Sequence, residues 1–470
     1  MKNSKLNLIL RSLNTKEKVF LNTFVSCDYF CKEPALKRAI KHLTDLDLST
    51  QTSDKQKLYA VIYPNQPYKD TKLRLAQSQL YKIVEQFLKI HYAVIDPELQ
   101  LNTEVFLLKY YRQHRLEKLY NSQATKLKKL YADTAETSWS DHILRTKLDT
   151  EIEVYQYDSA VKRRQALNLQ EILDTTDLIY YARKLKFACM ALAHQTVFKQ
   201  EYKLDNLKWI LADINSKKLA DIPLVGAYYH AYHMIKEPDN ELIFQYFDSY
   251  LTEHEDQLSD EDLQTLYLFS INQCIRQLNN GNKSYGLKGL ELYERALGKG
   301  VLLIDGHVSR FTYRNIAMMA IRSDDLDWAE AFTHKYAPQL QKADKHSAFN
   351  HNLALIYYYK NNYEEALTYI QEADFKDHLI HLAAKTLQAK IYYELKADQS
   401  LYSLLDSVEI YLIRNKIIGY HRNNYRNIIK FFKKLSRTNP YDKEKKQKLV
   451  EQITSEEILT EKKWLLEKLS

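Results

Sequence analysis

The chain has 470 residues with a formal net charge of +8 at pH 7, and 45% of its residues are hydrophobic. Only 8 Gly and 8 Pro occur, which excludes the many tight turns of a sheet protein and argues against a glycine-rich phosphate loop. The 4 cysteines are too few and too scattered for a disulfide framework, which favours a reducing compartment, and no run of about 18 apolar residues predicts a membrane span.

Residues 1–95 predict a separate basic helical unit with 16 Lys or Arg against 8 Asp or Glu. Asn14–Glu17 is a helix start, Leu36–Leu46 predicts a second helix and Lys69–Tyr92 a long third helix. The apolar run after Lys5 is too short for a signal peptide. A helix-turn-helix variant is an alternative interpretation, but the tight glycine-containing turn is missing, so DNA binding is the less favoured function.

Residues 96–258 predict irregular helical hairpins. A weaker apolar pattern at Thr150–Ala166 predicts a loop between hairpins. The stronger patterns predict helices at Asn102–His114, Leu116–Ala132, Leu169–Lys199, Leu207–Ile214, Leu224–Ile235 and Glu241–Thr252. Proline at 223 and at 238 suits a helix start or a turn, where its missing N–H costs little.

Residues 259–437 contain a repeat. Three stretches fall into register at a spacing of 35 residues when Met319, Ala354 and Ala389 are set as equivalent. The first two carry an aromatic residue nine positions later and a small one twelve positions later, at Trp328 and Ala331 and at Tyr363 and Ala366. One period earlier the same pair occurs at Tyr293 and Ala296, whereas the third stretch is degenerate. A period of about 34 residues made of two helices is typical of tetratricopeptide-like (TPR-like) solenoids.

Residues 438–470 predict a C-terminal cap. Tyr420–Leu435, before it, is a basic amphipathic helix, and residues 411–470 hold 15 Lys or Arg against 7 Asp or Glu. Thr454 with Glu457 matches a capping box for a final helix that contains Trp464 and Leu469. Terminal repeats need a polar outer face, so this charge has a structural explanation; a contact with nucleic-acid phosphate is the alternative.

Motifs for catalysis, cofactors or metals are not expected. The sequence lacks His-Glu-x-x-His, a P-loop, Gly-x-Ser-x-Gly and Gly-x-Gly-x-x-Gly. Cys27 and Cys31 lack a second cysteine pair for zinc, and His230 and His233 lie among tyrosines that favour helix packing over metal binding. Three aspartates before Trp328 favour a helix cap over a calcium loop. We therefore expect no cofactor and no catalytic residue.

The first helix of each repeat is expected to line the concave face. Resemblance to TPR modules places ligand-facing positions at His351, Leu355 and Tyr358 in one unit and at Thr386, Lys390 and Tyr393 in the next. Only Lys390 matches the Lys and Asn positions of a TPR clamp for a C-terminal carboxylate, which argues against a chaperone-tail adaptor. We predict that His351, Tyr358, Lys390 and Tyr393 bind an extended or helical segment of acidic character.

Several short blocks resemble, in order and spacing, an uncharacterised bacterial family of TPR-like helical-repeat proteins. These blocks are Tyr63-Pro64, Leu73-Arg74, Leu173-Asp174, Tyr180–Lys186, Pro223 with Tyr228-Tyr229, Asn272–Ile275 with Asn280-Gly281, Asn315–Phe332 and Lys463–Lys468. The resemblance spans nearly the whole chain and implies a fold and a cytoplasmic setting. It implies no activity.

The sequence thus predicts an all-α TPR-like solenoid with a helical N-terminal unit and C-terminal capping helices. Its expected regions are 1–95, 96–258, 259–437 and 438–470. The expected function is a non-enzymatic scaffold or adaptor in the cytoplasm that binds an unidentified protein or peptide and no membrane. A nucleic-acid-binding regulator that uses its basic N-terminal unit or C-terminal helix is the alternative.

Overall fold

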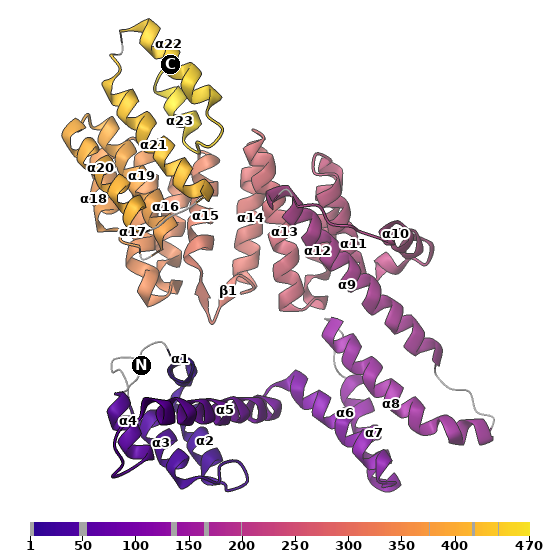
Figure 1. Cartoon of the computed structure of the whole chain (residues 1–470). Coiled ribbons are helices and arrows are strands. Elements are labelled where there is room, and N and C mark those ends of the chain that lie inside the picture. The colour runs from indigo at the N-terminus through magenta and orange to yellow at the C-terminus, as the bar shows by residue number, and fades with distance from the viewer. Residues whose placement is uncertain are drawn as a thin grey trace. The chain divides into compact units, whose positions relative to one another are not determined.

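The fold is all-α and is built from packed helical hairpins (Figure 1), as the sequence predicts. The computed structural model describes residues 4–46, 54–132, 139–163, 169–198, 200–375, 377–415, 419–439 and 441–470. Within these residues the only strands are β1 (Leu303–Ile304) and β2 (His307–Val308), which form an antiparallel hairpin. Packing divides the chain into two compact units, residues 1–136 with 140–177 and residues 137–139 with 178–470. The four regions expected from the sequence stay a prediction.

The first unit begins with five helices around one apolar core. They are α1 (Lys5–Ser12), α2 (Thr15–Ser26), α3 (Pro34–Asp45), α4 (Lys55–Ile62) and α5 (Asp70–Ile95). The helix start predicted at Asn14 is confirmed, because the Asn14 side chain accepts a 2.9 Å hydrogen bond from the Glu17 amide. The Glu17 carboxylate in return accepts one of 2.8 Å from the Asn14 amide, which completes a capping box.

The first unit continues with α6 (Pro97–Gln113), α7 (Glu117–Ala132) and α8 (Trp139–Arg163). The prediction of a loop at Thr150–Ala166 is wrong over residues 150–163, which are helical; residues 164–166 lie outside the described part of the chain. The cause is an apolar stripe in α8: Leu144, Leu148 and Ile152 are buried at a spacing of four residues, which a helix places on one face.

The second unit is a series of hairpins in which, from α11 onward, each helix packs on the next. It includes the later part of α9 (Leu169–Phe198), followed by α10 (Leu207–Ser216), α11 (Pro223–Lys236), α12 (Glu241–His254), α13 (Asp260–Asn279), α14 (Ser284–Gly298), α15 (Arg310–Arg322), α16 (Leu326–Tyr336), α17 (Lys342–Tyr359), α18 (Tyr363–Glu372), α19 (His378–Glu394) and α20 (Asp398–Arg414). Short 3-10 turns lie at η1 (Leu219–Asp221), η2 (Glu255–Gln257) and η3 (Ala337–Gln339). Helices α15, α17 and α19 are the first helices of successive hairpins and pack on one another.

The repeat is present, but the spacing between its first two hairpins differs from the predicted spacing. Each hairpin turns at a residue with positive φ, Asp324, Asn361 or Lys396, and these lie 37 and then 35 residues apart. Four residues after each N-cap, Ala329, Ala366 and Leu401 are fully buried. Ala331 is exposed, so its assignment as the small crossing residue is wrong, whereas the assignment of Ala366 is confirmed.

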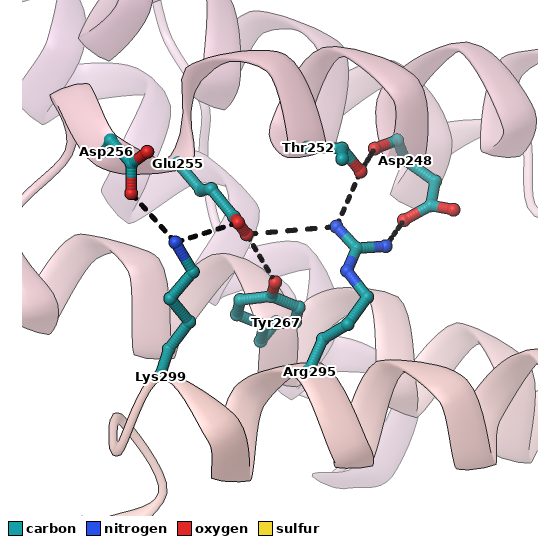
Figure 2. A network of polar contacts seen from close by, with 7 residues as sticks. All are labelled: Asp248, Thr252, Glu255, Asp256, Tyr267, Arg295 and Lys299. Carbon is teal, nitrogen blue, oxygen red and sulfur yellow. Dashed lines mark hydrogen bonds and ion pairs between the residues drawn. The ribbon is translucent and has the colours of Figure 1, made fainter.

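A polar network ties neighbouring hairpins together on the surface of the second unit. Figure 2 shows Lys299, the residue after α14, between Glu255 and Asp256, at 2.9 and 2.7 Å. Arg295, one turn earlier, pairs with Asp248 of α12 at 2.8 Å. The hydroxyl of Tyr267 on α13 donates a 2.7 Å hydrogen bond to Glu255. Because burial and this carboxylate both disfavour the phenolate, the pKa of Tyr267 rises to about 12.

The second unit ends with α21 (Gly419–Arg437), α22 (Lys443–Ser455) and α23 (Lys462–Glu467). The predicted amphipathic helix is confirmed in α21, whose Ile428, Phe432 and Leu435 are buried. The predicted capping box at Thr454 is wrong, because Thr454 lies inside α22 and its hydroxyl donates to the carbonyl of Val450. The final helix begins only at Lys462.

Candidate functional site

The candidate site is a groove on the first helices of the repeats. We define the repeat groove by the four predicted residues, His351 and Tyr358 on α17 and Lys390 and Tyr393 on α19. Three of them, His351, Tyr358 and Lys390, line a cavity of about 350 Å³ that is also bounded by α15, α21 and Glu461. Two further predicted positions, Leu355 and Thr386, line the same cavity.

The chain's own α23 lies against the repeat groove through Trp464. The indole N–H of Trp464 donates a 2.7 Å hydrogen bond to the hydroxyl of Tyr358. The Tyr393 ring meets the indole edge-on at 5.4 Å between centroids, and Phe432 of α21 stacks on it at 4.8 Å. The Lys390 ammonium lies 5.4 Å from the same ring, within the range of a cation–π contact. Trp464 is therefore buried among three of the four predicted residues.

Charged pairs hold the ends of α23 to α19. Lys390 forms an ion pair with Glu461, the residue that precedes α23, and both side chains are largely buried. Lys468, which follows α23, pairs with Glu394 at 2.6 Å. Burial strengthens both pairs relative to exposed ones. The groove thus complements one acidic and one aromatic side chain spaced three residues apart.

A buried asparagine on α21 fixes the segment that leads into α23. The Asn424 side chain accepts a 2.8 Å hydrogen bond from the Thr460 amide and donates one of 3.1 Å to its hydroxyl. Asn427, one turn on, donates a 3.0 Å bond to the carbonyl of Ile458. The irregular chain before α23 is therefore held in one conformation, which sets where Glu461 and Trp464 enter the groove.

Burial shifts the pKa values of two groove residues, His351 and Tyr358, toward their neutral forms. His351 is buried, and this burial, together with the nearby charge of Arg314, lowers its pKa to about 3. Burial likewise raises the pKa of Tyr358 far above its usual value. At neutral pH His351 therefore remains an uncharged imidazole that can both donate and accept a hydrogen bond.

The alternative sites weighed from the sequence show packing and capping contacts. His230 lies 4.7 Å from Tyr246 and 4.8 Å from Tyr250 between ring centroids, and burial lowers its pKa to about 4. Asp325 caps α16 by accepting a 3.2 Å hydrogen bond from the Trp328 amide, as predicted. Among the described residues no group of three or more His, Cys, Asp or Glu side chains is placed to hold a metal ion.

Several cations of the basic terminal regions are engaged within the chain. On α21, Lys433 pairs with Asp406 at 2.7 Å and with Glu409 at 3.2 Å. In the first unit, Lys37 pairs with Asp28 at 2.6 Å. Such exposed pairs are weak, about 0–1 kcal/mol, and a phosphate could compete for them. These ion pairs therefore do not decide whether the basic regions bind nucleic acid, and that alternative stays a prediction.

Three important residues of the site were missed from the sequence: Trp464, Glu461 and Arg314. Trp464 and Glu461 approach the groove from a distant part of the chain, and no local pattern reports that approach. Arg314 does leave a signal, because it lies four residues from both Arg310 and Met318, on the helix face that lines the cavities. A charged residue at such a position indicates a polar site.

Comparison with known proteins gives no relative from which a role could be transferred. No protein-family model matches the chain, and neither a curated protein nor a solved structure matches it. Within the described residues, no helix has both the length and the apolar character needed to cross a membrane.

Proposed function

We propose that this protein is a non-enzymatic TPR-like scaffold or adaptor whose repeat groove binds a segment of a protein partner. The partner segment carries an acidic residue and an aromatic residue about one helical turn apart. The bacterial TPR-like family named above, and a cytoplasmic setting, belong to the same proposal. The scarcity of cysteine supports the setting.

The observation that supports this proposal is the way the groove holds α23. Glu461 and Trp464 meet Lys390, Tyr358 and Tyr393 through an ion pair, a hydrogen bond and ring contacts. A buried aromatic anchor with a charged neighbour is the usual composition of a binding hot spot. An amphipathic helix in a groove is also a recurrent mode of peptide recognition.

On this proposal α23 competes with the partner for the groove. A tethered segment has an effective concentration in the millimolar range when its linker is short. The apparent affinity for a partner segment is therefore its intrinsic affinity multiplied by the fraction of molecules whose groove is open. Changes that release α23 should strengthen partner binding without any new contact.

A peptide copy of the C-terminal segment tests the proposal directly. Fluorescein-labelled peptide 457–470 would be titrated with the full chain carrying Trp464→Ala, and its anisotropy measured. We expect binding at least about tenfold tighter than to the unchanged chain, because the tethered competitor is weakened. Adding Lys390→Ala and Tyr393→Ala to the same variant should abolish this binding.

Trp209→Ala supplies the matched control, since Trp209 is 61% exposed and lies on α10, away from the groove. This variant should bind the peptide as weakly as the unchanged chain does. The proposal would be refuted if the Trp464→Ala chain bound the peptide no more tightly than the chain that also carries Lys390→Ala and Tyr393→Ala.

A further inference from the structure

A second candidate site surrounds Arg314 of α15. This side chain lines both the 350 Å³ cavity and a neighbouring cavity of about 200 Å³. Its Nε atom is buried without a hydrogen-bond partner, and the guanidinium forms no hydrogen bond or ion pair with any described residue. Arg314 as a whole is partly buried, and a cation withdrawn from water without a direct partner is costly, so its presence indicates that a ligand completes the site.

The two cavities differ in chemistry. The smaller one is largely apolar, with walls that include Phe311, Phe375, Leu379 and Ile380. The larger one is mainly polar and includes Thr386, Thr460 and Tyr425. Arg314, His351 and Ala383 line both cavities. A ligand there would meet a cation and a neutral imidazole at one end and apolar side chains at the other.

One cation of the cavity walls has no ion-pair partner among the described residues. Arg310 pairs with Asp344 at 2.8 Å and lies 4.0 Å from Asp377. Lys390 pairs with Glu461, whose carboxylate also attracts the Arg314 guanidinium without forming an ion pair with it, so Arg314 is the wall cation that lacks a direct ionic partner among the described residues. One guanidinium fits a single carboxylate, which it binds with two parallel N–H groups. A phosphate dianion would leave excess negative charge in this buried place.

We propose that this pair of cavities binds a small organic carboxylate with an apolar body. The carboxylate pairs with Arg314 beside the His351 imidazole, and the apolar body lies against Phe311, Phe375 and Leu379. The volume of the larger cavity alone falls in the range of about 300–1,000 Å³ typical of small-molecule sites. This site shares His351 and the larger cavity with the repeat groove and adds Arg314 of α15 and the smaller cavity, and its test does not require the proposed partner.

Calorimetric titration of the full chain with octanoate and with 3-phenylpropionate tests this inference. We expect saturable binding of one molecule of at least one acid, and much weaker binding of 1-octanol, which lacks the charge. Arg314→Gln should weaken the binding by at least about tenfold, because it removes the charged partner. Ala383→Leu should weaken it as well, since the added side chain fills the junction of the two cavities.

Arg322→Gln is the matched control, because Arg322 is an exposed arginine at the end of the same helix. It should leave binding unchanged. Circular dichroism and melting temperature show whether each variant is folded, and Arg314→Lys, which keeps the charge, provides a second variant that should retain part of the affinity. Saturable binding that survives Arg314→Gln, or no saturable binding of either acid up to its solubility limit, would overturn the inference.

Discussion

Trp464 of α23 donates its indole N–H to the hydroxyl of Tyr358 on α17 across a separation of 106 residues. The same indole stacks on Phe432 and meets Tyr393 edge-on. One side chain therefore joins the last helix to two repeat helices and to α21. The position of α23 depends on this residue more than on any contact within the short helix itself, since a helix this short is unstable alone.

Trp464→Ala should release α23 while the repeats stay folded. Loss of a buried tryptophan side chain costs about 3–5 kcal/mol, which exceeds what the ion pairs at the ends of α23 can supply. Hydrogen exchange should accelerate for the amides of residues 462–467 and remain slow in α17 and α19. Trp209→Ala should leave the exchange of α23 unchanged. Equal acceleration in α17 would show that Trp464 supports the whole unit instead.

Asp262 on α13 should be far more important for stability than its neighbour Glu261. Asp262 is 1% exposed and accepts hydrogen bonds from Lys186 at 2.9 Å and from the Tyr228 hydroxyl at 2.6 Å. Asp262→Ala leaves the buried Lys186 charge poorly paired and should lower the free energy of unfolding by about 3–5 kcal/mol.

Glu261 also contacts Lys186, at 2.9 Å, but its side chain is 73% exposed. Glu261→Ala should therefore cost no more than about 1 kcal/mol. Urea unfolding followed by circular dichroism measures both variants, and similar losses for the two would contradict the importance of burial here.

Replacing two helical glycines by alanine should change the stability of the chain in opposite directions. At Gly226 of α11 an added Cβ would clash with the backbone carbonyl of Ala220 and with the Tyr250 hydroxyl. Gly226→Ala should therefore destabilise the chain by about 1–3 kcal/mol. At Gly298 of α14 nothing lies within 4 Å of the new atom, so Gly298→Ala should stabilise by about 0.4–1 kcal/mol. Melting temperatures distinguish the two, and a stabilising Gly226→Ala would show that the α11 contact relaxes freely.

His351 should make the protein less stable as the pH falls. Burial, and then the charge of Arg314, lower its pKa from 6.5 to about 3 in the folded chain. Between these values the unfolded chain binds a proton that the folded chain does not, so stability is lost as the pH falls from about 6.5 toward 3, by up to about 1.4 kcal/mol per pH unit.

His351→Gln removes this proton uptake and should make the dependence of unfolding free energy on pH less steep over that window. Urea unfolding at a series of pH values measures the slope. His307→Gln, at an exposed histidine, should leave it as in the unchanged chain. An unchanged slope for His351→Gln would mean that His351 takes up its proton without unfolding.

Local patterns predicted the helices well because caps and apolar stripes are short-range signals. Asn14 and Glu17 formed the predicted capping box, and the buried face of α21 follows from its spacing. The same kind of signal failed at Thr454, because Thr454 lies in the last turn of α22, which ends at Ser455, and not before the start of a new helix. The two-residue error between Ala331 and Ala329 arose where the repeat lengthens from 35 to 37 residues, as the turn residues Asp324 and Asn361 show.

The groove was predicted in part, because repeat geometry alone indicates which positions of α17 and α19 share a face. Tyr358 and Lys390 do meet there, through Trp464. Trp464 itself could not be predicted as their neighbour, since the return of the chain to α17 depends on tertiary packing and not on any local spacing. The spacing of Arg314 from Arg310 and Met318 could have indicated its helix face, but the lack of a hydrogen-bond partner for its Nε atom is a property of the folded surroundings.

Exchanging the charges of Lys390 and Glu461 distinguishes binding of the partner from binding of α23 in one experiment. Glu461→Lys breaks the contact that holds α23 but keeps Lys390 in the groove. Lys390→Glu together with Glu461→Lys restores an ion pair of reversed polarity and removes the cation that a partner's acidic residue would meet. The unchanged chain and these two variants would be purified with their partners from native cells, with and without nuclease.

We expect one stoichiometric protein that survives nuclease, is captured more strongly by Glu461→Lys and is lost from the double variant. Equal capture of that protein by all three chains, or nucleic acid as the main companion with proteins lost on digestion, would contradict this expectation.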